Sequence, residues 1–380
     1  MATEHPRRPD NPVDLPVKIL EVAPGEPVLS VDGAFDAPGL NLSHWPGNRT
    51  PAALKRDLST GIALAFAELP PDERESMARG CTALVNNHFD TDGILSMFAI
   101  LNPEQALAHA ARLLDAAAAG DLFRCPSEEA FVFDSILTAF GDAERSPRGS
   151  ELRGLDDRAR RQLATEHALS ALPGILARDL VPYESIVRAP LETLRADLAD
   201  LQQAALDDLV HLDFVVRTQG VGMESTQGGT RGCFDPGRHA LWGTHLADRQ
   251  LVLGPSAQGT TCRFLIGTRS FFDMVTETSL PRPDLEALAE QLNDEEGTGS
   301  ADEVAWRCQH IEGASPELWF GLEGLPNYVE HAGTWLVPSS LDPTRIKSRV
   351  LDAVRATWVW PTEPDEDEIR PAADAAHPSS

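Results

Sequence analysis

The first 150 residues alternate between short apolar runs and longer stretches whose apolar positions recur at helical spacing. The runs at 17–22, 28–31 and 82–86 predict strands, and residues 51–69 predict a helix with Thr50 as its N-cap. This order is typical of a parallel α/β sheet, in which the loops after the strands meet at one edge. We therefore expect an N-terminal α/β domain with a mainly parallel sheet over residues 17–150.

Helical patterns dominate the middle of the chain. Four helices are expected, at 103–120, 127–140, 155–180 and 191–209. Ser127 is a good N-cap for the second of them, and Pro182 and Pro190 separate the last two. We expect residues 151–209 to form a helical connector to a second domain.

Short β-type runs separated by turn residues follow residue 209. The pattern predicts strands at 210–216, 240–242, 250–253, 261–266, 270–276, 306–308 and 317–320, and helices at 284–292 and 343–358. Strands at such short intervals favour an antiparallel sheet. Residues 210–360 are therefore expected to form a smaller, β-rich α+β domain, and the polar ends of the chain, 1–16 and 361–380, are expected to be disordered.

Composition narrows the function classes. The 380 residues carry a net charge of -27, which disfavours a long nucleic-acid partner because binding a phosphate backbone needs a basic surface. A small phosphorylated substrate is compatible with this charge, since bound metal ions invert the local field. The sequence has no apolar run of about twenty residues for a membrane span and no secretory signal. Five scattered cysteines without a C-x-x-C motif favour a reduced, cytoplasmic protein.

The candidate chemistry gathers in residues 82–101, TALVNNHFDTDGILSMFAIL. The stretch reads as strand, tight loop and helix, and the loop holds His88, Asp90 and Asp92. Alternate residues of an extended loop point the same way, so these side chains can converge on one or two divalent cations. The alternatives are an Asp-rich turn, or Asp92 as N-cap of the following helix. An EF-hand loop is excluded, because its twelfth position holds Ala99.

The segment 88–96, HFDTDGILS, resembles the first motif of the DHH phosphoesterase superfamily, H-x-D-x-D-G-x-x-S after a strand. The resemblance implies that His88, Asp90 and Asp92 bind a pair of metal ions, usually manganese, and that a metal-bound hydroxide attacks phosphorus. The Asp-His-His triplet of that family and its glycine-rich C-terminal substrate motif are absent from this sequence.

The polar loop at 32–50 holds further candidate ligands, Asp32 and His44. If the strands at 28–31 and 82–86 are parallel, this loop emerges at the same edge of the sheet as His88. Alternatively, it is a structured surface turn. Long loops that carry Trp, His, Asn and Arg are more often functional.

Other candidate ligands lie downstream. Asp121 and Asp134 are the nearest candidates for the second aspartate of the DHH pattern, and we include Asp121 in the expected metal-ligand set. His239 and His245 either complete a metal site or are ordinary histidines at strand ends. These alternatives remain open from the sequence alone.

Four arginines of the second domain are candidates for binding a phosphate: Arg231, Arg238, Arg263 and Arg269. On adjacent strands they would form an anion clamp, and the alternative is pairing with the many Asp and Glu residues. We expect Arg231, Arg263, Arg269 and His44 to bind substrate. The Gly-rich stretch 220–232 either cradles a phosphate or forms a hairpin loop, and it is not a Walker A loop, since the chain has no Gly-Lys pair.

These patterns favour a metal-dependent phosphoesterase-like hydrolase that acts on a small phosphorylated molecule or nucleotide. Its cofactor would be a divalent metal, which the resemblance implies is Mn²⁺, and its site would lie in the cleft between the domains. Two alternatives are a non-hydrolytic biosynthetic enzyme that reuses the same metal-binding loop, and a binding protein in which the loop is only a turn.

Overall fold

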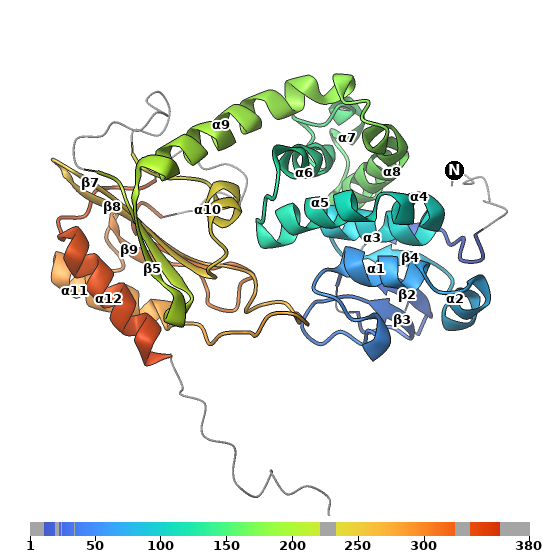
Figure 1. Ribbon diagram of the computed structural model, residues 1–380, viewed down its shortest axis with the longest axis horizontal. Coiled ribbons are helices and arrows are strands. Elements are labelled where there is room, and N and C mark those ends of the chain that lie inside the picture. The colour runs from blue at the N-terminus through green and yellow to red at the C-terminus, as the bar shows by residue number, and fades with distance from the viewer. Residues whose placement is uncertain are drawn as a thin grey trace, which may run out of the picture.

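A computed structural model describes residues 11–19, 23, 25–33, 35–220, 233–323 and 335–357 (Figure 1). Its described part contains a parallel sheet in the N-terminal region, a mixed sheet in the C-terminal region and twelve α-helices, so the expected α/β class is confirmed. Most of the two termini expected to be disordered, and the Gly-rich stretch from 221 to 232, lie outside the described residues. No helix in the described part is long and apolar enough to cross a membrane.

The N-terminal sheet has four parallel strands in the order β1 (Val17–Ile19), β4 (Leu84–Asn86), β2 (Val28–Val31) and β3 (Gly39–Leu42). Leu29 and Val31 face the main core, whereas Val28 packs on the other side with Val85, as strand periodicity requires. The strand β3 lies in the segment 32–50, where the sequence predicts a polar loop. Its sequence, GLNL, has too few apolar residues to stand out.

The N-terminal half has eight α-helices in its described part: α1 (Ser59–Ala67), α2 (Pro71–Met77), α3 (Thr91–Leu101), α4 (Pro103–Ala108), α5 (Ala110–Leu122), α6 (Glu128–Phe140), α7 (Gly149–Leu152) and α8 (Asp157–Leu176). The helices α1, α3 and α8 contact the strands, and α2 lies beside the sheet (Figure 1). Two helices that the sequence predicts as continuous are divided. Residues 51–69 form a 3₁₀ turn (Ala52–Leu54) and then α1, because Leu58 is extended. Residues 103–120 break at His109, between α4 and α5.

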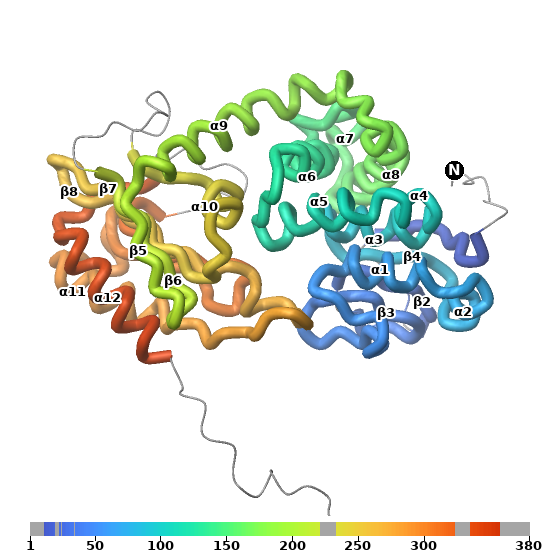
Figure 2. The backbone as a smooth tube through the Cα atoms, in the orientation of Figure 1, coloured from blue at the N-terminus to red at the C-terminus, as the bar shows by residue number. Residues whose placement is uncertain are grey.

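The helix α9 (Glu184–Gln203) joins the two halves of the molecule (Figure 2). It packs against α6 of the N-terminal half and against α10 (Arg238–Thr244) of the C-terminal half. The expected break at Pro190 is wrong, because α9 continues through this proline at the cost of one backbone hydrogen bond. The expected helix end at 209 is also wrong, since residues 205–209 are a strand.

The C-terminal sheet has six strands in the order β5 (Ala205–Leu209), β6 (Phe214–Thr218), β7 (Arg249–Ser256), β8 (Gly259–Ile266), β10 (Glu317–Gly321) and β9 (Ala305–Cys308). It is not purely antiparallel as expected: β6 and β7 are parallel, because α10 lies on the connection between them. The expected strand at 240–242 is therefore part of α10, and the described residues 270–276 form turns instead of a strand.

Helices cover both faces of this sheet. The helices α11 (Leu285–Glu296) and α12 (Pro343–Ala356) pack on one face with Leu251 and Leu253, while α10 packs on the other with Val252. The face with α10 looks toward the N-terminal half (Figure 1). After β8, the chain runs across to the N-terminal half and returns to α11 (Figure 2).

Candidate metal centre

The carboxyl ends of three neighbouring strands supply most of the candidate site. Asp32 follows β2, His44 lies two residues after β3, and His88 and Asp90 follow β4. Because β4, β2 and β3 are adjacent and parallel, their carboxyl ends lie at one edge of the sheet. The expectation that the loops at 32–50 and 87–93 meet at this edge is therefore correct.

Four buried residues form the first half of the centre: Asp32, His44, Asp92 and Asp121. The His44 Nε2 atom lies 3.6 Å from Asp32 Oδ1, 3.7 Å from Asp92 Oδ2 and 3.1 Å from Asp121 Oδ2. Asp121 reaches this group from the last turn of α5. One ligand atom of each residue lies within 4.8 Å of the others, so a single cation can contact all four.

Asp32, His88 and Asp90 form the second half. The His88 Nε2 atom lies 3.2 Å from Asp32 Oδ2 and 2.6 Å from Asp90 Oδ2. Asp32 thus points one oxygen into each half of the centre. Its backbone has a φ of +46°, a left-handed conformation that is uncommon for residues other than glycine.

Both histidines are oriented as metal ligands. The His44 Nδ1 atom lies 2.6 Å from the carbonyl oxygen of Asp57, and the His88 Nδ1 atom lies 2.5 Å from Asn87 Oδ1. Since each oxygen accepts a hydrogen bond, each Nδ1 donates its proton and Nε2 is directed at the carboxylates. Metal-binding histidines in proteins are usually held by an outer hydrogen bond of this kind.

Asp90 and Asp92 both face the centre and also accept hydrogen bonds from N–H groups at the start of a helix. Asp90 Oδ1 caps α3 by accepting from the Gly93 N–H, while its Oδ2 faces His88. Asp92 accepts from the N–H groups of Ser59 and Thr60, at the start of α1. The alternative in which Asp92 caps the following helix is therefore wrong. Asp90 caps α3, and Asp92 binds the N–H groups at the start of α1 instead.

The electrostatics of the cluster favour a cation. Burial, together with the neighbouring Asp90 carboxylate, raises the pKa of Asp32 to about 7. Burial and Asp90 also raise the pKa of Asp121 well above its usual value, and burial raises that of Asp92. Burial alone would lower the pKa of His88, but Asp90 and Asp32 raise it well above its usual value.

Three buried atoms that face the centre have no hydrogen-bond partner: Asp32 Oδ2, His44 Nε2 and Asp121 Oδ2. Orphaned polar atoms are costly in a protein interior, and more so in a cluster of like charges. Divalent cations would satisfy these atoms and neutralise the carboxylates. The buried Asp and His residues therefore have the composition and geometry to hold metal ions, with N and O ligands.

Three other candidates lie outside the cluster. Asp134 accepts from the Thr91 hydroxyl, so it supports the loop between Asp90 and Asp92 without reaching the centre. His239 lies on α10 and contacts the Ala119 carbonyl oxygen, because the expected strand there is a helix. His245 pairs with the exposed Asp208.

The expected arginine clamp does not form in the described residues. Arg263 is 1% exposed and pairs with Asp235 and Glu317, so the expectation that it binds phosphate is wrong. Arg238 pairs with Glu317 as well. Arg231 lies outside the described residues.

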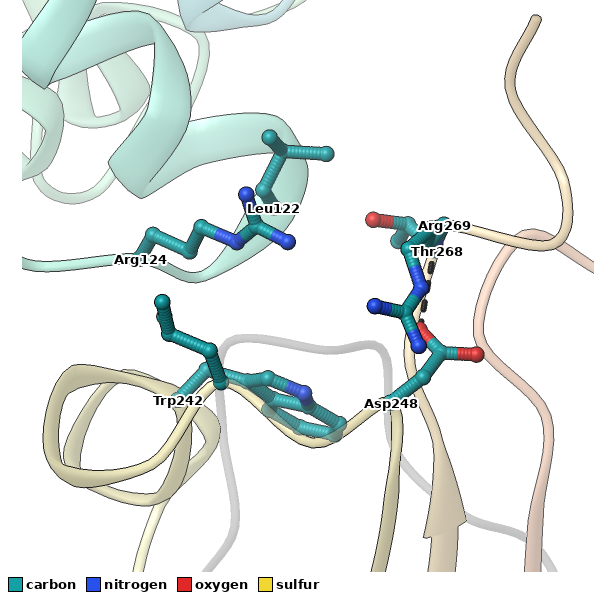
Figure 3. Close-up of a pocket in the computed structure, with 7 residues that line it drawn as sticks. Leu122, Arg124, Trp242, Asp248, Thr268 and Arg269 are labelled. Carbon is teal, nitrogen blue, oxygen red and sulfur yellow. Dashed lines mark hydrogen bonds between the residues drawn. The ribbon is translucent and has the colours of Figure 1, made fainter. Parts of the chain in front are cut away.

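Arg269 lines a small pocket between the two halves of the molecule, together with Leu122, Arg124, Trp242, Leu246, Asp248 and Thr268. The Arg124 and Arg269 side chains point toward one another across this pocket (Figure 3). Glu277 binds both guanidinium groups, and Arg269 also pairs with Asp213. Acidic side chains thus compensate the charges of Arg124 and Arg269. None of the candidate metal ligands of the centre lines this pocket.

The two halves of the centre differ in exposure. The side chains of His44, Asp32 and Asp92 are fully buried, whereas those of His88 and Asp90 are 22% and 32% exposed. Trp45 lies next to the more exposed part of the centre, with its ring centroid 5.0 Å from that of His88. Its indole N–H donates to Asp32 Oδ1. Solvent therefore reaches the centre from the side of His88 and Asp90.

Comparisons with known proteins show where the chain belongs. A family model described as a family of unknown function, DUF6687, matches residues 18–364. The chain belongs to this family. No curated protein and no solved structure shows a significant match. The matched range of DUF6687 includes both sheets except the first residue of β1, and it includes every candidate metal ligand of the centre.

From the sequence, Asp32 and His44 are only possible ligands, and His44 is expected to bind substrate as well. The structure places His44 among the carboxylates of the centre and gives Asp32 the central position. The missing signal was the strand β3, since its presence fixes where His44 lies relative to β2 and β4.

Gly93→Ala is expected to disturb the centre. A Cβ at Gly93 would lie 2.0 Å from Asn86 Nδ2 and 2.9 Å from Asp32 Oδ2, so these side chains would have to move. We expect Mn²⁺ affinity to fall by about tenfold or more, as for changes next to metal ligands. The measurement is calorimetric titration with Mn²⁺. Gly174→Ala is the control, because a Cβ there meets no atom within 4 Å. Wild-type affinity in Gly93→Ala would contradict this geometry.

Proposed function

We propose that this protein is a metal-dependent phosphoesterase-like hydrolase that acts on a small phosphorylated molecule or nucleotide, with Mn²⁺ as its cofactor. The main support for the proposal is that the two oxygens of the Asp32 carboxylate face different histidines. Oδ1 lies 3.6 Å from His44 Nε2, and Oδ2 lies 3.2 Å from His88 Nε2. A shared carboxylate of this kind suits a pair of metal ions. The resemblance of residues 88–96 to the first DHH phosphoesterase motif supports the same function.

A pair of bound divalent cations would supply a water of lowered pKa and positive charge for the oxygens of a phosphoryl group. His44, Asp92 and Asp121 would hold the buried cation, and His88 and Asp90 the exposed one, with Asp32 contacting both. N and O ligands of this mixture suit manganese. His44 would supply a second imidazole ligand, since the Asp-His-His triplet is absent from this chain.

The protein side chains fix the geometry of the centre. Trp45 Nε1 and the Ser59 hydroxyl donate to Asp32 Oδ1, at 3.2 and 3.0 Å, and so hold the shared carboxylate in place. The two N–H groups at the start of α1 favour the ionised form of Asp92, since a helix N-terminus attracts negative charge. The ligands are thus arranged by folding, and little reorganisation is needed on reaction.

A phosphoester panel tests this function. Purified protein with Mn²⁺ is expected to release phosphate or alcohol from at least one member of a panel of aryl phosphates, aryl phosphodiesters and nucleotides. Asp90→Asn is expected to lower kcat by more than about 100-fold, because it removes a charged ligand and not merely an outer contact. The exposed Asp72→Asn on α2 is the control and should match the wild type.

Two outcomes would contradict the proposal. Metal binding without turnover of any phosphoester would favour a non-hydrolytic enzyme on the same centre. Equal turnover by wild type and Asp90→Asn would place the activity elsewhere, or in a contaminant.

A further inference from the structure

One segment of the C-terminal half reaches the metal centre. Residues 268–277, here called the docking segment, lie between β8 and α11 and cross to the N-terminal half (Figure 2). Phe272 is 7% exposed, and its ring stacks on that of His44 with a centroid distance of 3.9 Å and an angle of 14°. The Asp273 N–H donates to the His44 carbonyl oxygen at 2.7 Å. The docking segment thus contacts both the ring and the backbone of a candidate ligand.

Asp57 links the docking segment to the same imidazole. Its carbonyl oxygen accepts from His44 Nδ1 at 2.6 Å. Its carboxylate accepts from the N–H groups of Val275 and Thr276, at 2.6 and 2.9 Å, and from the Thr276 hydroxyl. One residue therefore sets the orientation of His44 and holds the docking segment.

Charged contacts hold the middle and the C-terminal end of the docking segment. Asp273 pairs with Lys55 and accepts from Asn48, and both partners belong to the N-terminal half. Glu277 accepts two hydrogen bonds from Arg124, which lies three residues after the candidate ligand Asp121. The contacts of the docking segment thus converge on the two chain regions that carry His44 and Asp121.

We propose that Asp57 and Phe272 are positioning residues for His44, so that metal binding and docking of residues 268–277 are coupled. The inference rests on the metal centre of the proposed function and adds its link to the C-terminal half. Stacking on Phe272 and the bond to Asp57 restrict the imidazole to the rotation that aims Nε2 at the carboxylates. A cation that holds His44 in that rotation favours docking, and docking raises the affinity for the cation by the same factor.

Hydrogen exchange of the full-length protein, with and without Mn²⁺ alone, tests the coupling. The amides of Asp273, Val275 and Thr276 donate across to the N-terminal half, so their exchange reports docking. We expect Mn²⁺ to slow their exchange by about tenfold, the lower end of the range for outer contacts of metal ligands. Equal exchange with and without bound Mn²⁺ would overturn the coupling and leave the metal centre intact.

Variants test the same link from the side of the metal. Phe272→Ala and Asp57→Ala are each expected to weaken Mn²⁺ binding by about tenfold or more. Asp57→Asn retains an acceptor oxygen and is expected to recover most of the affinity. Val275→Ala is the control, because the side chain of Val275 is 56% exposed and its N–H is kept. Wild-type affinity in both alanine variants would overturn the proposal, and wild-type protein that binds no metal would overturn the metal centre as well.

Discussion

Asp32→Asn is expected to stabilise the metal-free protein and to remove most of the stabilisation that Mn²⁺ gives the wild type. A carboxyl whose pKa moves from 3.8 to about 7 on folding costs the folded state about 4 kcal/mol once it is ionised. Asparagine removes that charge but keeps an oxygen for Trp45 and Ser59. Metal at about 1,000 times its Kd adds about 4 kcal/mol to the wild type, and the variant loses this because both halves of the centre use Asp32.

Thermal unfolding of both proteins, with a chelator and with Mn²⁺, measures the two effects. Asp248→Asn is the matched control, since Asp248 is also buried with its pKa raised to about 6, yet it lies outside the metal cluster. Its effect on stability should be independent of Mn²⁺. If Asp32→Asn were destabilising with the chelator and gained as much from Mn²⁺ as the wild type, Asp32 would be a structural residue and not a shared ligand.

The metal-free protein is expected to lose stability as the pH rises from about 4 to above 7. The pKa values of Asp32, Asp92, Asp121 and His88 are all raised in the folded state. The folded state therefore binds more protons than the unfolded state in this range, and stability falls as those protons leave. Burial raises the pKa of Asp90 and His88 lowers it more, and because the net change is a lowering from 3.8, it acts below about pH 4 and leaves this trend intact.

Metal reverses this dependence on pH. Metal ligands must be deprotonated, so Mn²⁺ affinity and the stability it confers increase with pH. Denaturant unfolding at pH 5 and pH 8 is the measurement: the free energy of unfolding with the chelator should be lower at pH 8, and the gain from Mn²⁺ should be larger there. A metal-free protein that is more stable at pH 8 than at pH 5 would contradict the charge balance of the centre.

The sequence predicts the part of the centre that is local in the chain. His88, Asp90 and Asp92 stand out because a strand, a loop and a helix follow one another within 20 residues. Asp121 and Asp134 are both candidate ligands from the sequence. Only the packing of α5 and α6 shows that Asp121 reaches the centre and Asp134 does not. Spacing along the chain could not make that distinction, because both residues lie on helices.

The remaining ligands depend on tertiary packing. His44 reaches the centre because β3 pairs in parallel with β2. The four residues of β3 have mixed polarity, so their pattern does not predict this pairing. Asp92 caps a helix more than 30 positions away in the chain, so its partner could not be found from local capping patterns. The stacking of Phe272 on His44 joins two halves of the molecule and has no local signal at all.

The C-terminal half shows the limits of periodicity. The sequence predicts β7 and β8 because both faces of these strands are buried, which gives short continuous runs of strand-forming residues bounded by turns. The short helix α10 was mistaken for a strand because its apolar run, Ala240–Trp242, is too brief to show a helical period. Arg238, Arg263 and Arg269 form internal ion pairs, which is the alternative that the sequence left open for them.

The most direct test of the metal centre is the elemental content of the purified protein, measured for the wild type beside Asp90→Ala/Asp92→Ala. The shared Asp32 carboxylate leads us to expect two equivalents of divalent metal per wild-type chain after incubation with Mn²⁺, and at most a trace in the double variant. A wild-type protein that retains no metal after this incubation would contradict the metal centre, and with it the proposed phosphoesterase function.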